Sequence, residues 1–218
     1  MPWWGRGVSG RREVQAQARR FAMFLQVMQG KVGDRDALER QMELWRTQFR
    51  PTAKGFLGST SGFTDDGQFV ALARFESVEA AAANSHMPEQ NAWWEKLAAA
   101  FDGEVGFTDC AEVDTMMGGG SDAAGFVQIM RGRAVDPAAM RDTSAEMEKA
   151  LAAARPDIVG GIVGWHGDRE FVQAIYFTSV DAARAGEKTM QDDAGAAEWE
   201  AMLDGPLTFT DLHDIRFD

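Results

Sequence analysis

The chain has 218 residues, of which 45% are hydrophobic and 26% are charged, the composition of an ordinary globular protein with a sizeable core. No run of 18 or more apolar residues occurs, so no membrane span is expected, and the net charge of −12 argues against nucleic-acid binding. The single cysteine, Cys110, excludes an intrachain disulfide and favours a cytoplasmic location.

The first 20 residues differ from the rest, because they contain five arginines and one glutamate. They have neither the apolar segment nor the cleavage site of a secretory signal. We treat residues 1–20 as a basic N-terminal extension, and three interpretations stay open. The extension is a flexible tail, or residues 14–20 form a packed helix, or translation starts naturally at Met23, just before the first predicted strand.

The first predicted strand and helix are followed by a proline stop. Residues 21–32 form a nearly continuous apolar run, as expected for a strand buried on both faces. Asp34 can cap a helix, and Pro51 ends it. The apolar residues of that helix recur at helical spacing: Leu38, Met42, Trp45 and Phe49.

A predicted hairpin and a second helix complete the first half. Glycines between residues 55 and 62 and the turn sequence at residues 65–67 indicate two strands, the second over residues 68–75. Ser77 caps an alanine-rich helix that breaks near Met87 and Pro88. Residues 104–113 form the last strand, so the order is βαββαβ.

The same pattern then recurs about 102 residues later. Residues 24–31 (FLQVMQGK) return as 126–133 (FVQIMRGR), and residues 75–81 (FESVEAA) return as 177–183 (FTSVDAA). A constant offset indicates tandem duplication. The second half is therefore predicted to have strands over 126–134, 158–165, 171–177 and 207–216, with helices after Asp136 and Ser179.

These elements predict an α+β fold with two tandem ferredoxin-like units, residues 21–116 and 124–218, joined by a Gly-rich linker over 117–123. A four-stranded sheet with helices on one face leaves its other face uncovered. We therefore expect the units to pack sheet to sheet as an intrachain pseudo-dimeric α+β barrel. The expected state is a monomer with this internal pseudo-dimer, and further self-association is left open.

Three stretches resemble a known family: the Phe-x-Gln-x-Met-x-Gly first strands, residues 74–80 (RFESVEA) and residues 84–94 (NSHMPEQNAWW). They are similar to the dimeric α+β barrel superfamily, in particular to tandem antibiotic-biosynthesis-monooxygenase-like domains. The resemblance implies an aromatic-lined pocket in each unit, between the sheet and its own helices. Haem-degrading members use an Asn on the first strand, a Trp near the third and a His on the second helix. Here Gln26 and Phe75 replace the first two, and only His86 is a partial match.

Two residues are candidates for catalysis. His86 can transfer protons near neutral pH, and the neighbouring Asn84 can orient it or a substrate oxygen. The alternative is a solvated histidine at a helix break. Tyr176, the only tyrosine, can donate a hydrogen bond to a carbonyl substrate, or it is an ordinary strand tyrosine.

Further candidates for substrate binding come from positions that differ in character from their surroundings. Gln26 and Gln128 interrupt apolar strands at equivalent places, where they bind a ligand or have a structural role. Arg74 takes the place of Tyr176 in the first half, and Phe75 follows it. Trp94 has a counterpart in Trp199 and is expected in the core, whereas Trp93 has none and is freer to line a cavity.

Two functions remain open. The three histidines show no metal-ligand spacing and the glycines no phosphate-loop context, so we expect neither a metal nor a cofactor. The first function is a small-molecule enzyme resembling cofactor-independent monooxygenases that act on a hydrophobic or aromatic compound. The alternative is a non-catalytic binding or stress-associated protein that sequesters a hydrophobic metabolite. In both, the partner is a small hydrophobic molecule.

Overall fold

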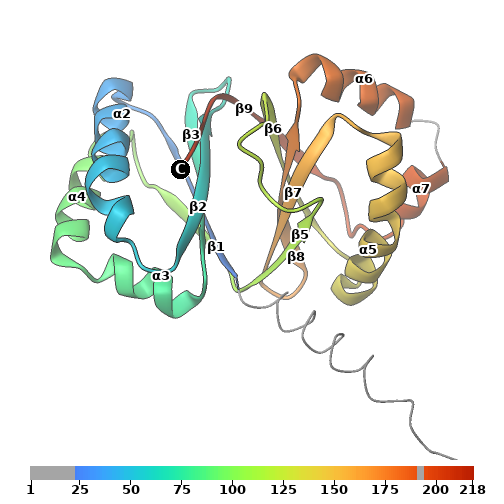
Figure 1. The fold of residues 1–218 in the computed structure, drawn as a ribbon, viewed down its shortest axis with the longest axis horizontal. Helices are drawn as coiled ribbons and strands as arrows, with labels where there is room; N and C mark the ends of the chain where they lie inside the picture. The colour runs from blue at the N-terminus through green and yellow to red at the C-terminus, as the bar shows by residue number, and fades with distance from the viewer. Residues whose placement is uncertain (1–22, 191–193) are drawn as a thin grey trace, which may run out of the picture.

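The computed structural model describes residues 23–190 and 194–218, which form two similar halves (Figure 1). The interpretations of residues 1–20 lie outside this part of the chain. No helix in the described ranges is both long enough and apolar enough to cross a membrane.

The first half follows the predicted order. Asp34 caps its first helix, accepting a hydrogen bond from the Ala37 amide at 2.9 Å, and Ser77 caps the next in the same way. The predicted helix break is confirmed, because one helix ends at Ser85 and another begins at Pro88. The elements are β1 (Phe24–Lys31), α2 (Arg35–Leu44), the single turns η1 (Trp45–Phe49) and η2 (Arg50–Thr52), β2 (Phe56–Phe63), β3 (Gln68–Phe75), α3 (Val78–Ser85) and α4 (Pro88–Ala98).

The second half repeats this order. Asp136 caps its first helix by accepting from the Ala138 and Ala139 amides, and Pro137 takes the first helical position, as predicted. The elements are β6 (Phe126–Arg133), α5 (Pro137–Ala154), β7 (Ile158–His166), β8 (Glu170–Phe177), α6 (Val180–Met190) and α7 (Ala194–Glu200).

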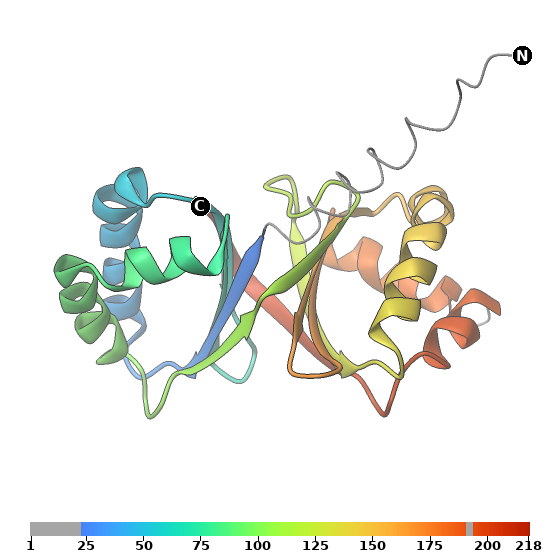
Figure 2. The ribbon, with the colours of Figure 1, turned by 90° about the horizontal axis from the view of Figure 1, so that it is seen from below.

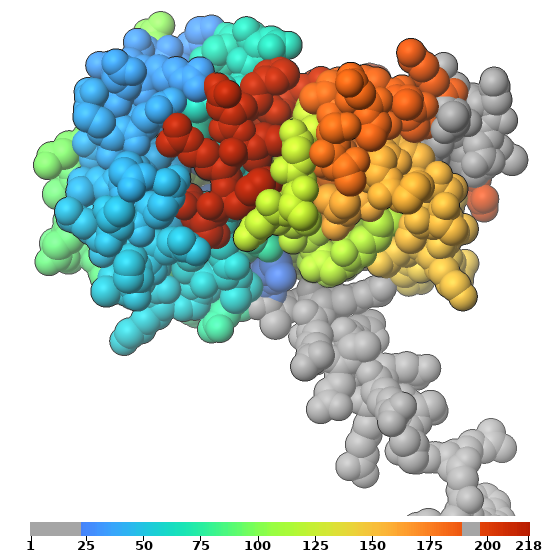
Figure 3. All heavy atoms as spheres, turned by 45° about the horizontal axis from the view of Figure 1, so that its top comes forward, coloured from blue at the N-terminus to red at the C-terminus, as the bar shows by residue number. Residues whose placement is uncertain are grey.

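The final strand of each half crosses to the other half, which the sequence did not predict. The strand expected over 104–113 is divided into β4 (Gly106–Cys110), which pairs with β1, and β5 (Glu112–Met116), which pairs with β7. The last strand, β9 (Thr208–Phe217), pairs first with β6 and then with β2. Figure 3 shows the end of β9, in red, lying against the blue and cyan first half.

These crossings close the sheet into a barrel. The strand order is β4-β1-β3-β2-β9-β6-β8-β7-β5, and β4 runs directly into β5, so the chain joins both ends of this order. The two sheets face each other and the helices lie outside them (Figure 2). Thus the predicted fold, two ferredoxin-like units forming an intrachain pseudo-dimeric α+β barrel, is confirmed. The barrel interior is apolar and includes Leu25, Val27, Leu72, Val127, Ile129, Ile162, Val172 and Leu212.

Candidate functional site

A cavity of about 1160 Å³ lies mainly in the second half, between the outer face of the sheet and helices α5, α6 and α7. First-half residues also line it: Met23, Gln29, Thr64, Asp65, Asp66 and Gln68. This volume is large enough for a drug-sized organic molecule. The cavity exists because successive strand residues point to opposite faces: one set fills the barrel and the other faces the helices.

The floor of the cavity is apolar with two amides in it. In one row across the sheet, Gln173 of β8 lies between Val163 and Met130. In the next row, Gln128 of β6 lies beside Ile175. The aromatic residues of the floor and the apolar residues of the helical wall complete the lining: Trp165, Phe171, Phe177, Met140, Met147, Leu151 and Trp199.

The two amides differ in the strength of the hydrogen bonds that they donate. The Gln128 Nε2 donates to Asp211 Oδ1 at 3.0 Å, as Gln26 donates to Asp109 at 2.8 Å in the first half. The Gln173 Nε2 donates to the sulfur of Met116 at 3.4 Å. Sulfur is a weak acceptor, so this amide can still gain from a ligand oxygen.

Ion pairs occupy the edge of the cavity. Arg141 lies 2.5 Å from Glu112 and 2.9 Å from Asp114, with its guanidinium over the Trp165 ring. Trp165 Nε1 donates to the same Asp114 oxygen at 2.8 Å. Although Arg141 Nε is within ion-pair distance of Asp114, it has no aligned acceptor among the described residues. A buried donor therefore remains at the cavity edge.

A second ion-pair group lies beside α6. Arg184 contacts Asp211 and pairs with Glu187 at 2.7 Å, and its guanidinium lies over the Phe126 ring. Asp211 thereby joins Arg184 to the Gln128 amide. No three His, Cys, Asp or Glu side chains within 23–190 and 194–218 are grouped as a metal site.

The corresponding space in the first half is filled with side chains. Equivalent residues of the two halves are 102 apart, and Trp45 and Phe56 stand where the second half has Met147 and Ile158. The Trp45 and Phe56 rings meet edge to face, 4.8 Å between centroids. The side chains of the second half are smaller at these positions, and Ser144 also takes the place of Met42. This loss of side-chain volume leaves the cavity open.

Of the eight residues proposed from sequence, one lines the cavity: Gln128. His86 is exposed at the end of α3, with its Nδ1 2.6 Å from the Ala82 carbonyl oxygen. Asn84 is buried, and its Nδ2 donates to the carbonyls of Lys54 and Ala80, which ties α3 to the loop before β2.

The other proposed residues lie in the barrel or in the first half. Tyr176 is fully buried in the barrel, its hydroxyl 2.7 Å from Thr60 Oγ1, and burial raises the pKa of its phenol. Arg74 lies on β3 at the same barrel end, as the residue equivalent to Tyr176. Trp93 Nε1 donates to the Gln41 carbonyl at 2.8 Å, and Phe75 packs against Phe56. Gln26 makes the hydrogen bond to Asp109 described above.

The sequence reasoning missed most polar residues of the cavity, although the repeat contained a signal for them. Gln173 replaces Ala71, Arg184 replaces Ala82 and Arg141 replaces Glu39. A residue of the helix-sheet space that is polar in only one copy, or has the opposite charge there, marks a place where that copy has a separate role.

Comparison with known proteins identifies the fold. No family model matches the chain, and no curated protein matches it by sequence. A candidate monooxygenase from Fusobacterium nucleatum superposes with a TM-score of 0.70 at 8% identity, over 90% of this chain and 94% of that one. A candidate monooxygenase from Lactobacillus acidophilus gives 0.64 at 14% identity, over 88% and 93%. An anthrone oxidase-like protein gives 0.62 at 11% identity, over 90% and 93%.

At these identities the likeness concerns the fold. Each of the three structures is matched over nearly its whole length, so both halves of this chain have counterparts within one chain. The protein has a dimeric α+β barrel fold in its tandem form, and it shares this fold with the three structures.

Proposed function

We propose that the protein is a small-molecule enzyme of the cofactor-independent monooxygenase kind, and that the second-half cavity binds its hydrophobic, aromatic substrate. The observation that carries this proposal is the asymmetry between the halves. One helix-sheet space is packed with tryptophan and phenylalanine, and the equivalent one is open and carries a weakly bonded amide, Gln173.

Cofactor-free oxygenation makes few demands on a protein. The substrate loses a proton and then reduces O₂ itself. When a ring CH₂ becomes a carbonyl, one O₂ is consumed and one water is released. The protein must hold the substrate away from water, accept the proton and stabilise the resulting oxyanion with hydrogen-bond donors. The fold neighbours named as monooxygenases make this chemistry the first to test.

The cavity has residues for each task. Gln173 Nε2 is a donor available to an oxyanion, since its present acceptor is a sulfur. Glu148 of α5 lines the cavity, and its Oε1 accepts from the Met117 amide at 2.7 Å. Its Oε2 has no hydrogen bond to any described residue, so we assign Glu148 the role of proton acceptor.

A second function, sequestration without turnover, is favoured by a different observation. The arginines at the cavity edge are already paired with carboxylates of the same half or of β5. A cavity with paired charges binds a neutral molecule without any reaction.

The deciding experiment measures binding and turnover separately. Protein purified from its own host is first examined by native mass spectrometry for a co-purifying molecule. That molecule, and anthrone as a neutral three-ring probe, are then tested for O₂ uptake in buffer containing a metal chelator. We expect Glu148→Gln to lower turnover by about 100-fold while binding persists, and Gln173→Ala to weaken binding.

The matched control is Gln26→Ala, which removes the equivalent of Gln128 from the closed first half and should leave turnover unchanged. Binding without O₂ uptake would support sequestration instead. If Gln26→Ala and Gln173→Ala lower binding equally, the second-half cavity is not the binding site.

A further inference from the structure

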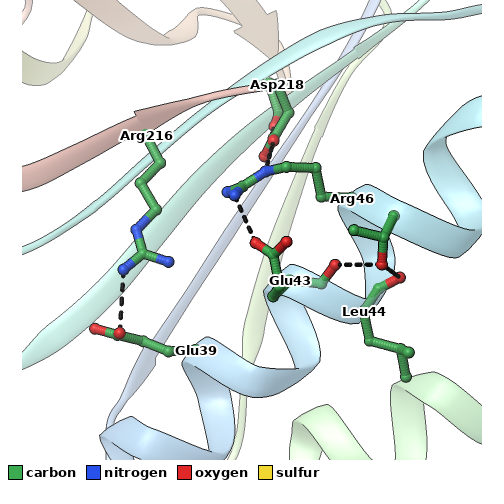
Figure 4. A network of polar contacts seen from close by, with 8 residues as sticks. Glu39, Glu43, Leu44, Arg46, Arg216 and Asp218 are labelled. Carbon is green, nitrogen blue, oxygen red and sulfur yellow. Dashed lines mark hydrogen bonds and ion pairs between the residues drawn. The ribbon is translucent and has the colours of Figure 1, made fainter.

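The contacts between the two halves carry opposite charges at equivalent positions. In the second half, Asp114 of β5 pairs with Arg141 of α5 at 2.9 Å. In the first half, the equivalent positions are occupied by Arg216 of β9 and Glu39 of α2, which pair at 3.1 Å (Figure 4). The two ion pairs are related by the 102-residue repeat, with acid and base exchanged.

This exchange has a consequence for pairing. If two first halves from separate chains associated, Asp114 of one chain would lie against Glu39 of the other. If two second halves associated, Arg216 would lie against Arg141. Both are like-charge contacts, which oppose association. At these two positions, only the pairing of a first half with a second half brings opposite charges together.

A second ion pair also favours the pairing of a first half with a second half. Arg46 of η1 bonds Asp218 at 2.6 Å, and the Asp218 side chain is 1% exposed (Figure 4). The equivalents of Arg46 and Asp218 are Glu148 and Met116. Association of two second halves would therefore place Asp218 against Glu148, and association of two first halves would leave Arg46 facing a methionine.

The barrel end gives a third contact between equivalent residues. Gln29 and Arg131 are 102 apart and touch directly, Arg131 Nη2 donating to Gln29 Oε1 at 2.8 Å. Two second halves would bring two arginines together at this point, where burial already lowers the pKa of Arg131. By contrast, Glu112 and Asp214 are equivalent and both acidic, so they do not discriminate.

We propose that these contacts form a pairing code: each half is built to accept the other half and to reject a copy of itself. The code is needed because the crossing strands create an interface at which two first halves, or two second halves, of separate chains could otherwise pair. A duplicated gene starts with identical halves, which pair indiscriminately. The charge exchange removes that ambiguity.

The test removes the discrimination while keeping the ion pairs. Glu39→Arg combined with Arg216→Asp retains an acid-base pair in the first half, but both halves then carry the same arrangement. The change avoids Asp114 and Arg141, which border the cavity. A Gln29→Cys reporter, in a Cys110→Ala background, detects pairing of two first halves, since residue 29 of each chain would then meet at the barrel end.

Reporter chains with and without the exchange are unfolded, refolded at high concentration with oxidised glutathione, and run on a non-reducing gel. We expect the covalent dimer to increase at least several-fold in the exchanged variant. An equal amount of dimer in both would overturn the proposal. The control is Arg40→Asp with Asp142→Arg, which reverses one basic and one acidic residue in the same way. Both residues are exposed and form no ion pair within the described ranges, so the amount of covalent dimer should not increase.

If the exchanged variant fails to fold, Asp114→Arg with Arg141→Glu makes the same test through the other ion pair. Both variants are compared with their single substitutions in thermal melts. Each single substitution should lower the melting temperature, and the second should restore most of the loss. Absence of that recovery in both pairs would also contradict the code.

Discussion

Trp45 lies edge-on to Phe56, with their ring centroids 4.8 Å apart and their planes at 70°. Their equivalents in the second half, Met147 and Ile158, both line the cavity. This one aromatic contact marks the difference between the packed and the open half. Trp93 and Phe49 add to it, with centroids 6.0 Å apart.

Met147→Trp should close the cavity, because it copies the side chain of the packed half. We expect ligand binding to be lost and the free energy of unfolding to change by less than about 1.5 kcal/mol, as the added ring enters existing space. Isothermal titration and chemical denaturation check the two parts. The matched change, Trp45→Met, should cost about 2–4 kcal/mol by leaving a void in the first half. A similar loss of stability in both variants would mean that the cavity wall cannot accept the ring.

Asp157 should make stability depend on acid pH. Arg155 binds its carboxylate through two hydrogen bonds, at 2.9 and 2.7 Å, and so lowers the pKa of Asp157 from its usual 3.8. A lowered pKa in the folded state means that this stabilisation is complete above about pH 5 and is lost as the pH falls through the folded-state pKa.

Asp157→Asn should therefore cost about 2–4 kcal/mol near pH 7, because it leaves the buried Arg155 guanidinium with a weaker partner. The loss should shrink below about pH 3. Urea denaturation at a series of pH values measures both effects. Parallel stability curves for the variant and the wild type would show that the pair does not titrate with folding.

Tyr176→Phe should lower stability and leave turnover intact. The hydroxyl is buried and bonded to Thr60, so its removal leaves the threonine hydroxyl without that partner, at a cost of about 1–2 kcal/mol. The residue faces the barrel interior and does not line the second-half cavity. Thermal melts measure the stability and O₂-uptake assays measure the turnover. Loss of turnover without loss of stability would show that Tyr176 has a role in catalysis.

Cys110 should resist alkylation in the folded protein. Its side chain is fully buried, and burial raises the pKa of the thiol to about 12. Because only the thiolate reacts, iodoacetamide at about pH 8 should modify it only through unfolding. Mass spectrometry with and without denaturant measures this, and rapid labelling of the native protein would show that β4 opens locally.

Much of the fold could be predicted because it depends on local patterns. The β3 strand over Gln68–Phe75 and the break at Pro88 follow from hydrophobic runs, caps and a proline. The constant 102-residue offset then fixed two units. Strand exchange could not be predicted this way, since β4 and β5 read as one strand and nothing local tells which sheet each part joins.

The site was harder to predict for a different physical reason. His86 attracted attention through its chemistry, but its exposure depends on where α3 ends. The cavity arises because Met147 and Ser144 are smaller than their first-half equivalents. A smaller side chain forms no sequence motif that would reveal the cavity. Comparison of the two halves, position by position, is the method that would have found Gln173 and Arg184 from sequence.

The route of β9 also bears on synthesis of the chain. The edge of β2 is covered by residues 213–217, which are synthesised after the other strands of both halves. During translation the first half therefore has an unpaired edge at β2 until these residues are made. Such an edge binds chaperones or neighbouring nascent chains. Emergence of residues 213–217 from the ribosome is the event that completes the pairing of this edge.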